Sequence, residues 1–117
     1  MTGPLARAKA QTETQIVRAI LDYLAANWVL AWRVNTGAAR NPAGRLVRFG
    51  IPGMPDIAGV LPGGRACIFE VKRVGRIPTH TQMLMMERLR ATGALVWVLH
   101  SVAGARVALV TGGIKAL

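Results

Sequence analysis

Apolar residues recur at helical spacing near the start of the chain. They lie three or four positions apart, which predicts an amphipathic helix over residues 12–27 with one buried face. The same spacing returns over residues 79–92, where Gly93 follows as a stop signal. The first stripe consists of Ile16, Val17, Ile20, Leu21 and Leu24, and the second includes Met85, Met86 and Leu89.

Between and after these helices, shorter apolar runs predict strands. Residues 57–61 and 65–72 flank Pro62-Gly63-Gly64, whose glycines supply the positive φ of a tight turn. The continuous apolar run 95–99 predicts a strand covered on both faces. Residues 29–36 and the short run 46–49 are further strand candidates, and the polar, glycine-bearing segment 37–44 between them predicts a mobile loop. Near the end, either Ser101 caps a last helix or residues 106–111 form an edge strand.

The resulting order, α-β-β-β-α-β, predicts an α/β fold with a mixed central sheet flanked by helices, because a strand-helix-strand unit crosses over right-handedly. A length of 117 residues with 52% apolar content predicts one domain spanning residues 1–117, with residues 1–11 frayed. We expect Trp28 and Trp32 to be core or interface residues rather than base-stacking ones. A soluble, intracellular protein without membrane association is expected, since no long apolar run or leader-like segment occurs.

Two carboxylates flank the predicted hairpin. With the turn centred on Gly63, Asp56 lies opposite Glu70, and directly opposed side chains share a face with Cβ atoms about 4.5–5.5 Å apart. Period-two alternation puts Lys72 on that face beside Glu70. A slip of one residue would set Asp56 against Val71 instead.

Opposed like charges weaken a sheet unless something lies between them. Hard cations such as Mg²⁺ are commonly held by one or two carboxylates together with phosphate oxygens. Asp56 and Glu70 therefore suit a phosphodiester-cutting site that uses Mg²⁺ or Mn²⁺. Lys72 would orient or deprotonate the attacking water, or neutralise charge on the phosphate. The alternative is a surface hairpin with a solvated E-x-K pair.

Two further polar residues lead the apolar stripes of the helices. Glu13 heads the buried face of the first helix, where it is metal-linked, paired or hydrated, or else simply favoured by the helix dipole and open to water. Gln82 completes a Thr79-His80-Thr81-Gln82 capping box and also heads an inward stripe. Each residue therefore has a structural and a functional interpretation.

The charge balance favours a polyanionic partner. Fifteen Lys and Arg against five Asp and Glu give +10, and arginine outnumbers lysine twelve to three. Arginine forms forked, bidentate contacts with phosphate, and such binding weakens steeply with salt. A single cysteine, Cys67, excludes an internal disulfide, and two histidines leave no Cys/His zinc cluster. The candidate phosphate-contacting residues are Arg33, Arg40, Arg45, Arg48, Arg73 and Arg76.

The motif residues carry a family resemblance. Pro55-Asp56 followed by Glu70-Val71-Lys72 resembles the signature of the PD-(D/E)XK nuclease superfamily. With Gly53-Met54 before it and Thr81-Gln82 after it, the pattern resembles the VRR-NUC family of that superfamily. The segment 33–37 is also similar to the stretch that follows the first helix of such domains, and the likeness covers residues 12–101.

This resemblance implies a restriction-endonuclease-like core and a role for each motif residue. It implies metal ligation by Asp56 and Glu70, with the Val71 carbonyl as a third oxygen, a catalytic Lys72, the motif glutamine Gln82 near the site, and Glu13 close to the metal.

Similar stand-alone domains resemble homodimeric nucleases that act on branched, Holliday-junction-like DNA. The resemblance therefore implies a metal-dependent, structure-specific endonuclease. The competing hypothesis is a non-catalytic basic module that grips nucleic acid through its arginines.

Overall fold

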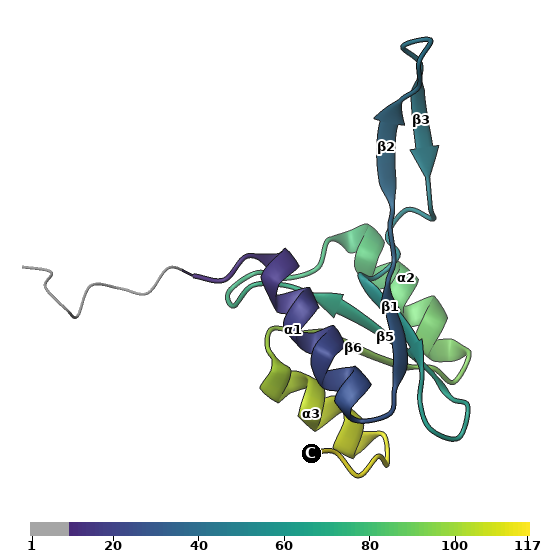
Figure 1. Ribbon diagram of the computed structural model, residues 1–117. Coiled ribbons are helices and arrows are strands. Elements are labelled where there is room, and N and C mark those ends of the chain that lie inside the picture. Colours follow the sequence, from purple (N-terminus) through teal and green to yellow (C-terminus); the bar gives the residue numbers. More distant parts are fainter. Residues whose placement is uncertain (1–9) are drawn as a thin grey trace, which may run out of the picture.

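Three helices and six strands make up residues 10–117, the part of the chain that the computed structural model describes. The expectation that residues 1–11 are frayed falls, for residues 1–9, outside this range. In chain order the elements are α1 (Glu13–Ala26), β1 (Leu30–Arg33), β2 (Gly37–Arg40), β3 (Leu46–Phe49), β4 (Ile57–Val60), β5 (Ala66–Val71), α2 (His80–Ala91), β6 (Leu95–Leu99) and α3 (Val102–Thr111) (Figure 1).

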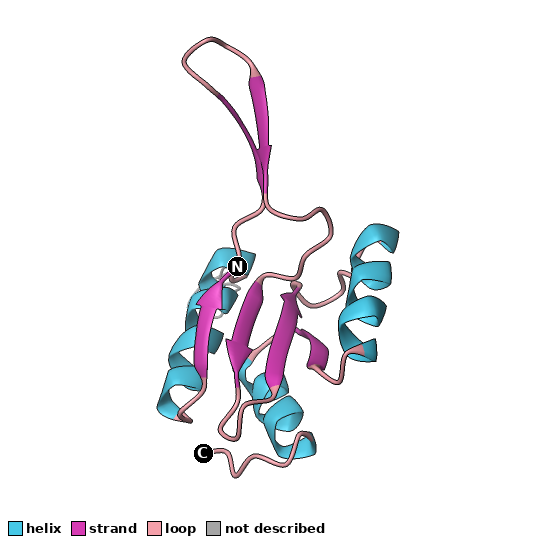
Figure 2. Cartoon of the chain, turned by 90° about the vertical axis from the view of Figure 1, so that its right-hand side faces the viewer, coloured by secondary structure: helices cyan, strands magenta, loops and turns pink. Residues whose placement is uncertain are grey.

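A mixed four-stranded sheet in the order β1-β4-β5-β6 forms the centre of the molecule. β1, β4 and β5 are antiparallel neighbours, whereas β6, reached through α2, pairs parallel with β5. α1 and α3 cover one face of the sheet and α2 lies on the other (Figure 2). The predicted α/β class and the core order α-β-β-β-α-β are confirmed. β3 coincides with the candidate strand 46–49 and α3 with the helical alternative after Ser101, whereas β2 was not predicted.

The larger core lies between the sheet and the pair α1 and α3. Ile20 and Leu24 of α1 pack there against alternate residues of the central strands, such as Ile57 and Phe69, and all four are fully buried. Because strand residues alternate between faces, the residues between them point toward α2. There Ile68 and Met86 belong to a smaller second core.

Side-chain caps set the helix boundaries. Thr12 forms a capping box with Gln15 at the start of α1, and Thr79 forms one with Gln82 at the start of α2. Ser101 accepts a bond from the Gly104 N–H at 3.1 Å, which satisfies one free donor of α3. The helical alternative for the end of the described chain is therefore confirmed, and the edge-strand alternative is wrong.

One expectation about the segment after α1 is wrong. Residues 37–40, predicted as part of a loop, form β2, which pairs with β3 in a separate two-stranded sheet. We call residues 36–50 the arm, because they project away from the body (Figures 1 and 2). Of the two places expected for Trp28 and Trp32, the core is excluded, because they remain 87% and 50% exposed, and the interface stays a prediction.

Gly53 joins the returning end of the arm to the body at the start of α2. Its φ is +80°, and an added Cβ would lie 2.9 Å from the Thr81 carbonyl oxygen. Only glycine fits this left-handed, closely packed position without strain. The glycine that precedes Pro55-Asp56 therefore allows that pair to approach the sheet beside α2.

None of the helices within residues 10–117 is both long enough and apolar enough to span a lipid bilayer.

We expect Gly53→Ala to lower the free energy of unfolding by about 1–3 kcal/mol, because it adds both backbone strain and a steric conflict with Thr81. Gly63→Ala is the matched control, since Gly63 also has positive φ, +96°, but open space around it. Urea unfolding of both variants measures the difference. Equal losses of unfolding free energy in the two variants would show that the close packing of Gly53 on Thr81 does not contribute to the effect.

Candidate active site

The site is built on the register of β4 and β5. Ile57 pairs with Phe69 and Ala58 with Ile68, so the preceding residue, Asp56, stands opposite Glu70 as the sequence predicts. Asp56 Oδ2 also accepts a 2.7 Å hydrogen bond from the Val71 N–H. This bond ties the first carboxylate to the strand that carries the second.

Glu70 is a buried acid. It is only 2% exposed, and its Oε2 atom has no hydrogen-bond partner. Burying a carboxylate without a partner is costly, so such atoms in native proteins generally have a protein, water or ion partner. The orphaned oxygen beside Asp56 marks a position where an additional positive ligand would be stabilising.

The surroundings of Glu70 favour its neutral form. Burial is the largest cause, and the adjacent Asp56 carboxyl adds to it, so the pKa of Glu70 rises to about 9. The charge of Glu13 acts in the same direction, whereas that of Lys72 opposes it. The influence of Lys72 agrees with the prediction that its side chain lies on the Glu70 side of the strand.

Lys72 follows β5 directly, and its main chain is held by the neighbouring β6 segment. Its N–H donates to the Leu99 carbonyl at 3.0 Å, and its own carbonyl lies 2.8 Å from Nδ1 of His100. With the proton on Nδ1, the His100 ring donates to this carbonyl. Sequence patterns gave no partner for His100, because the contact joins residues that are 28 positions apart.

A cavity of about 540 Å³ opens in front of Lys72. Glu13 and Thr12, at the start of α1, and Thr79, the cap of α2, line it together with Lys72. The structure therefore brings Glu13, from a different element, to the cavity that Lys72 lines, and its role near a metal stays a prediction. Glu13 remains partly exposed there.

Gln82 is used by the helix cap. Its Oε1 accepts a 2.8 Å bond from the Thr79 N–H, and its own N–H donates to the Thr79 hydroxyl. The structural interpretation of Gln82 is thus observed directly. Its predicted contact with the metal site stays a prediction.

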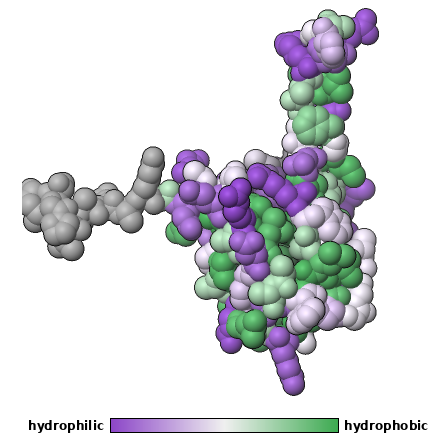
Figure 3. Space-filling view, viewed as in Figure 1, coloured by the Kyte–Doolittle hydropathy of each residue, from purple (hydrophilic) through white to green (hydrophobic). Residues whose placement is uncertain are grey.

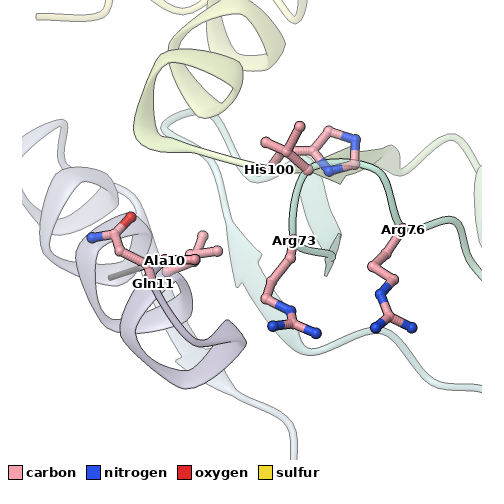
Figure 4. Close-up of a pocket in the computed structure, with 7 residues that line it drawn as sticks. Ala10, Gln11, Arg73, Arg76 and His100 are labelled. Carbon is pink, nitrogen blue, oxygen red and sulfur yellow. The ribbon is translucent and has the colours of Figure 1, made fainter. Parts of the chain in front are cut away.

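The candidate phosphate-contacting arginines fall into three groups. Arg73 and Arg76 lie on the loop after β5, where their side chains extend in the same direction (Figure 4). Both also line the cavity of Lys72. Three other arginines lie on the arm, and one is the last residue of β1, next to α1. These are Arg40, Arg45 and Arg48 on the arm, and Arg33 on β1.

The donor set fits a hard divalent cation. Asp56 and Glu70 provide carboxylate oxygens at one point, and one of those oxygens lacks a partner. No group of three or more acidic, histidine or cysteine side chains forms a cluster within residues 10–117, so Glu13 does not complete a three-residue set. Cys67 lies in the opposite core, where burial raises its pKa to about 11.

This combination of a mixed sheet, flanking helices and a hairpin carrying an acid pair defines a restriction-endonuclease-like domain. Among solved structures, a VRR_NUC domain matches with a TM-score of 0.61 and 25% sequence identity, over 85% of this chain and 94% of that chain. No family model matches the sequence, and no curated protein does so either. The fold match and the motif residues together support membership of the VRR-NUC family.

Without divalent cations, we expect the stability of the protein to fall as the pH rises from about 5 to 9. The folded state keeps the Glu70 proton up to about pH 9, whereas the unfolded chain loses it near 4.5, so the folded state binds more protons across this window. Glu70→Gln should flatten the decline, as measured by Tm at several pH values in EDTA. At neutral pH, Mn²⁺ should raise the Tm of the parent protein but not that of Glu70→Gln.

The matched control is Glu87→Gln, which changes an exposed acid on α2. Its Tm should depend on pH, and respond to Mn²⁺, as the Tm of the parent protein does. A parent-like profile for Glu70→Gln would contradict the titration of Glu70 in this range.

Proposed function

We propose that the protein is a metal-dependent endonuclease that hydrolyses phosphodiester bonds in DNA. The observation that carries the proposal is the buried Glu70, with an unpartnered oxygen, opposite Asp56 and beside Lys72. A purely structural hairpin would gain nothing from this arrangement, because it leaves a buried carboxylate unsatisfied. The likeness of the fold to a VRR_NUC domain supports the same proposal.

Asp56 and Glu70 would hold Mg²⁺ or Mn²⁺, with the Val71 carbonyl as a further oxygen ligand. When bound, the cation supplies a Lewis acid that makes water more acidic and stabilises negative charge on the phosphate. The Val71 N–H keeps Asp56 Oδ2 in place by its 2.7 Å bond. This bond restrains one ligand before any cation or substrate arrives.

Lys72 would act on the attacking water or on the phosphate. Its main chain is fixed by Leu99 and His100, so its side chain starts from a defined position at the mouth of the cavity. A positioned ammonium stabilises charge that develops in the transition state. Glu13, across the same cavity, would accept a hydrogen bond from water there. Gln82 would contribute from the start of α2, with its cap retained.

The basic surroundings support DNA as the substrate. Arg73 and Arg76 flank Lys72 in the cavity, and no acid occurs between Tyr23 and Pro55, the segment that includes the arm. Phosphate contacts of this kind position a backbone without reading its sequence. A domain with such contacts selects its substrate by shape, and we propose that branched or otherwise structured DNA is preferred.

We further propose that two copies associate, so that two sites face one branched substrate. Leu30 and Trp32 project from the edge strand β1 on the same face as Val60, and they are 71% and 50% exposed. Trp28, immediately before β1, is 87% exposed. Exposed apolar side chains gathered on an edge strand are typical of an interface rather than of a free surface.

Cleavage of labelled four-way and flap DNA in Mg²⁺ or Mn²⁺ tests the activity. We expect Asp56→Ala and Lys72→Ala to lower the cleavage rate at least about 100-fold, because each removes a group that acts on the reacting phosphate. Binding measured in EDTA should stay within about twofold for both variants, since neither is a principal phosphate anchor. Asp22→Ala, which changes an exposed acid on α1, is the control and should cleave normally.

Binding without cleavage by the parent protein, under all these conditions, would favour the basic binding module instead. Joint loss of binding and cleavage in both variants would overturn the assignment of the site.

The association of two copies is tested by Leu30→Lys. A buried lysine at an apolar interface is strongly unfavourable, so this variant should sediment as a monomer where the parent sediments as a dimer. Val107→Lys, at a 51% exposed apolar residue of α3, is the matched control and should leave the dimer intact. A monomeric parent protein at micromolar concentration would contradict the proposal.

A further inference from the structure

The arm, residues 36–50, has no partner within the sheet of the body. β2 and β3 pair only with each other and project from one end of the molecule (Figures 1 and 2). An isolated two-stranded ribbon is marginally stable in water. A ribbon that projects in this way is therefore best explained by something that it contacts outside the body.

The two faces of the arm differ in chemistry. Alternation along the observed register places Arg40 and Arg48 on one face, whereas Val47 and Phe49 occupy the other. Phe49 lies over Gly37, where an added Cβ would approach its ring to 3.2 Å. Hydrophilic residues dominate the tip and apolar ones the shaft (Figure 3). The arm thus has a cationic face and an apolar face that stiffens it.

The tip of the arm is a turn held by hydrogen bonds. The Asn41 N–H donates to the Arg45 carbonyl at 2.9 Å. In return, the Arg45 N–H donates to the side-chain oxygen of Asn41, also at 2.9 Å. Gly44 takes the positive φ that the turn needs, +79°, and its carbonyl accepts a 2.9 Å bond from the Arg40 guanidinium. The turn residues are thereby held in one compact arrangement, and Arg45 is presented at the end of the ribbon.

The stem of the arm adjoins the candidate active site. Val34, just before the arm, donates its N–H to the Asp56 carbonyl at 2.7 Å. At the other end, Gly50 packs so closely that an added Cβ would lie 2.8 Å from the Asn35 carbonyl oxygen. A duplex bound at the candidate active site would therefore pass the foot of the arm.

We propose that the arm enters the major groove of B-form duplex DNA beside the cleavage site. This inference rests on the proposed nuclease function and adds the form of the duplex that flanks the cut. The B-form major groove, about 12 Å wide, admits a two-stranded ribbon, whereas the deep, narrow major groove of A-form RNA does not. The arm carries three arginines and no acid, which complements phosphate and opposes contact with a second, equally basic copy.

The test measures binding of a labelled duplex of about 30 base pairs, roughly three helical turns. The full chain carries Asp56→Ala and is kept in EDTA, and the affinity is determined over a range of salt concentrations. Arg45→Ala/Arg48→Ala removes two arm charges whose side chains are free of the turn's hydrogen bonds, unlike Arg40. Loss of two phosphate contacts should reduce the slope of log K against log salt by about 1.8.

Three controls isolate the arm. Arg88→Ala/Arg106→Ala removes two exposed charges from α2 and α3 and should leave the slope unchanged. Arg45→Lys/Arg48→Lys keeps the charges and should restore the parent slope, which excludes a folding defect. An RNA duplex of the same sequence should bind the parent and the arm variant with equal slopes.

An unchanged slope for the arm variant on DNA would overturn the proposal, as would an equal loss on duplex RNA. A change in sedimentation of the arm variant would overturn it in favour of a contact with a second copy. Failure of the nuclease function is distinguishable, because the parent chain would then show the arm-dependent slope but no cleavage of any DNA in Mg²⁺ or Mn²⁺.

Discussion

The antiparallel register of β4 and β5 is the constraint on which the site depends. It brings Asp56 level with Glu70 and leaves Ile57, Phe69 and Val71 on the opposite face, buried against α1 and α3. If β5 slipped by one residue against β4, Glu70 would turn into the core and the apolar residues of β5 would turn out of it. The hydrophobic core therefore enforces the alignment of the carboxylates, although it makes no contact with a substrate.

The energetic cost of placing the two carboxylates side by side falls mainly on one side chain. Glu70 is buried with an unpartnered oxygen, and burial raises its pKa. Such a residue persists only where the surrounding structure holds it in place. Here that support comes from pairing on both sides of β5, with β4 and with β6, and from the Lys72 main chain, which is bound to Leu99 and His100. The region around Glu70 is thus stabilised by its neighbours rather than by itself.

Much of this arrangement could be predicted from the sequence, because its signals are local. Two glycines centred the turn at Gly63 and gave the correct opposition of Asp56 and Glu70, and the apolar stripes gave both main helices within a residue or two. β2 was missed because a strand without a core face has no apolar alternation. For Trp32 the sequence left core and interface open, because aromatic residues are usually buried, and only its 50% exposure excludes the core. The contact from His100 to Lys72 depends on the parallel pairing of distant segments, which no local pattern encodes.

The two ends of the arm leave and rejoin the body at nearly the same point, where an added Cβ on Gly50 would lie 2.9 Å from Cα of Thr36. A segment with adjacent ends can be lengthened, shortened or replaced with little effect on the scaffold that carries it. The arm can therefore be altered while the geometry at Asp56 and Glu70 stays the same. The molecule is in this sense modular, with a body that fixes the acid pair and an arm whose length the body does not determine.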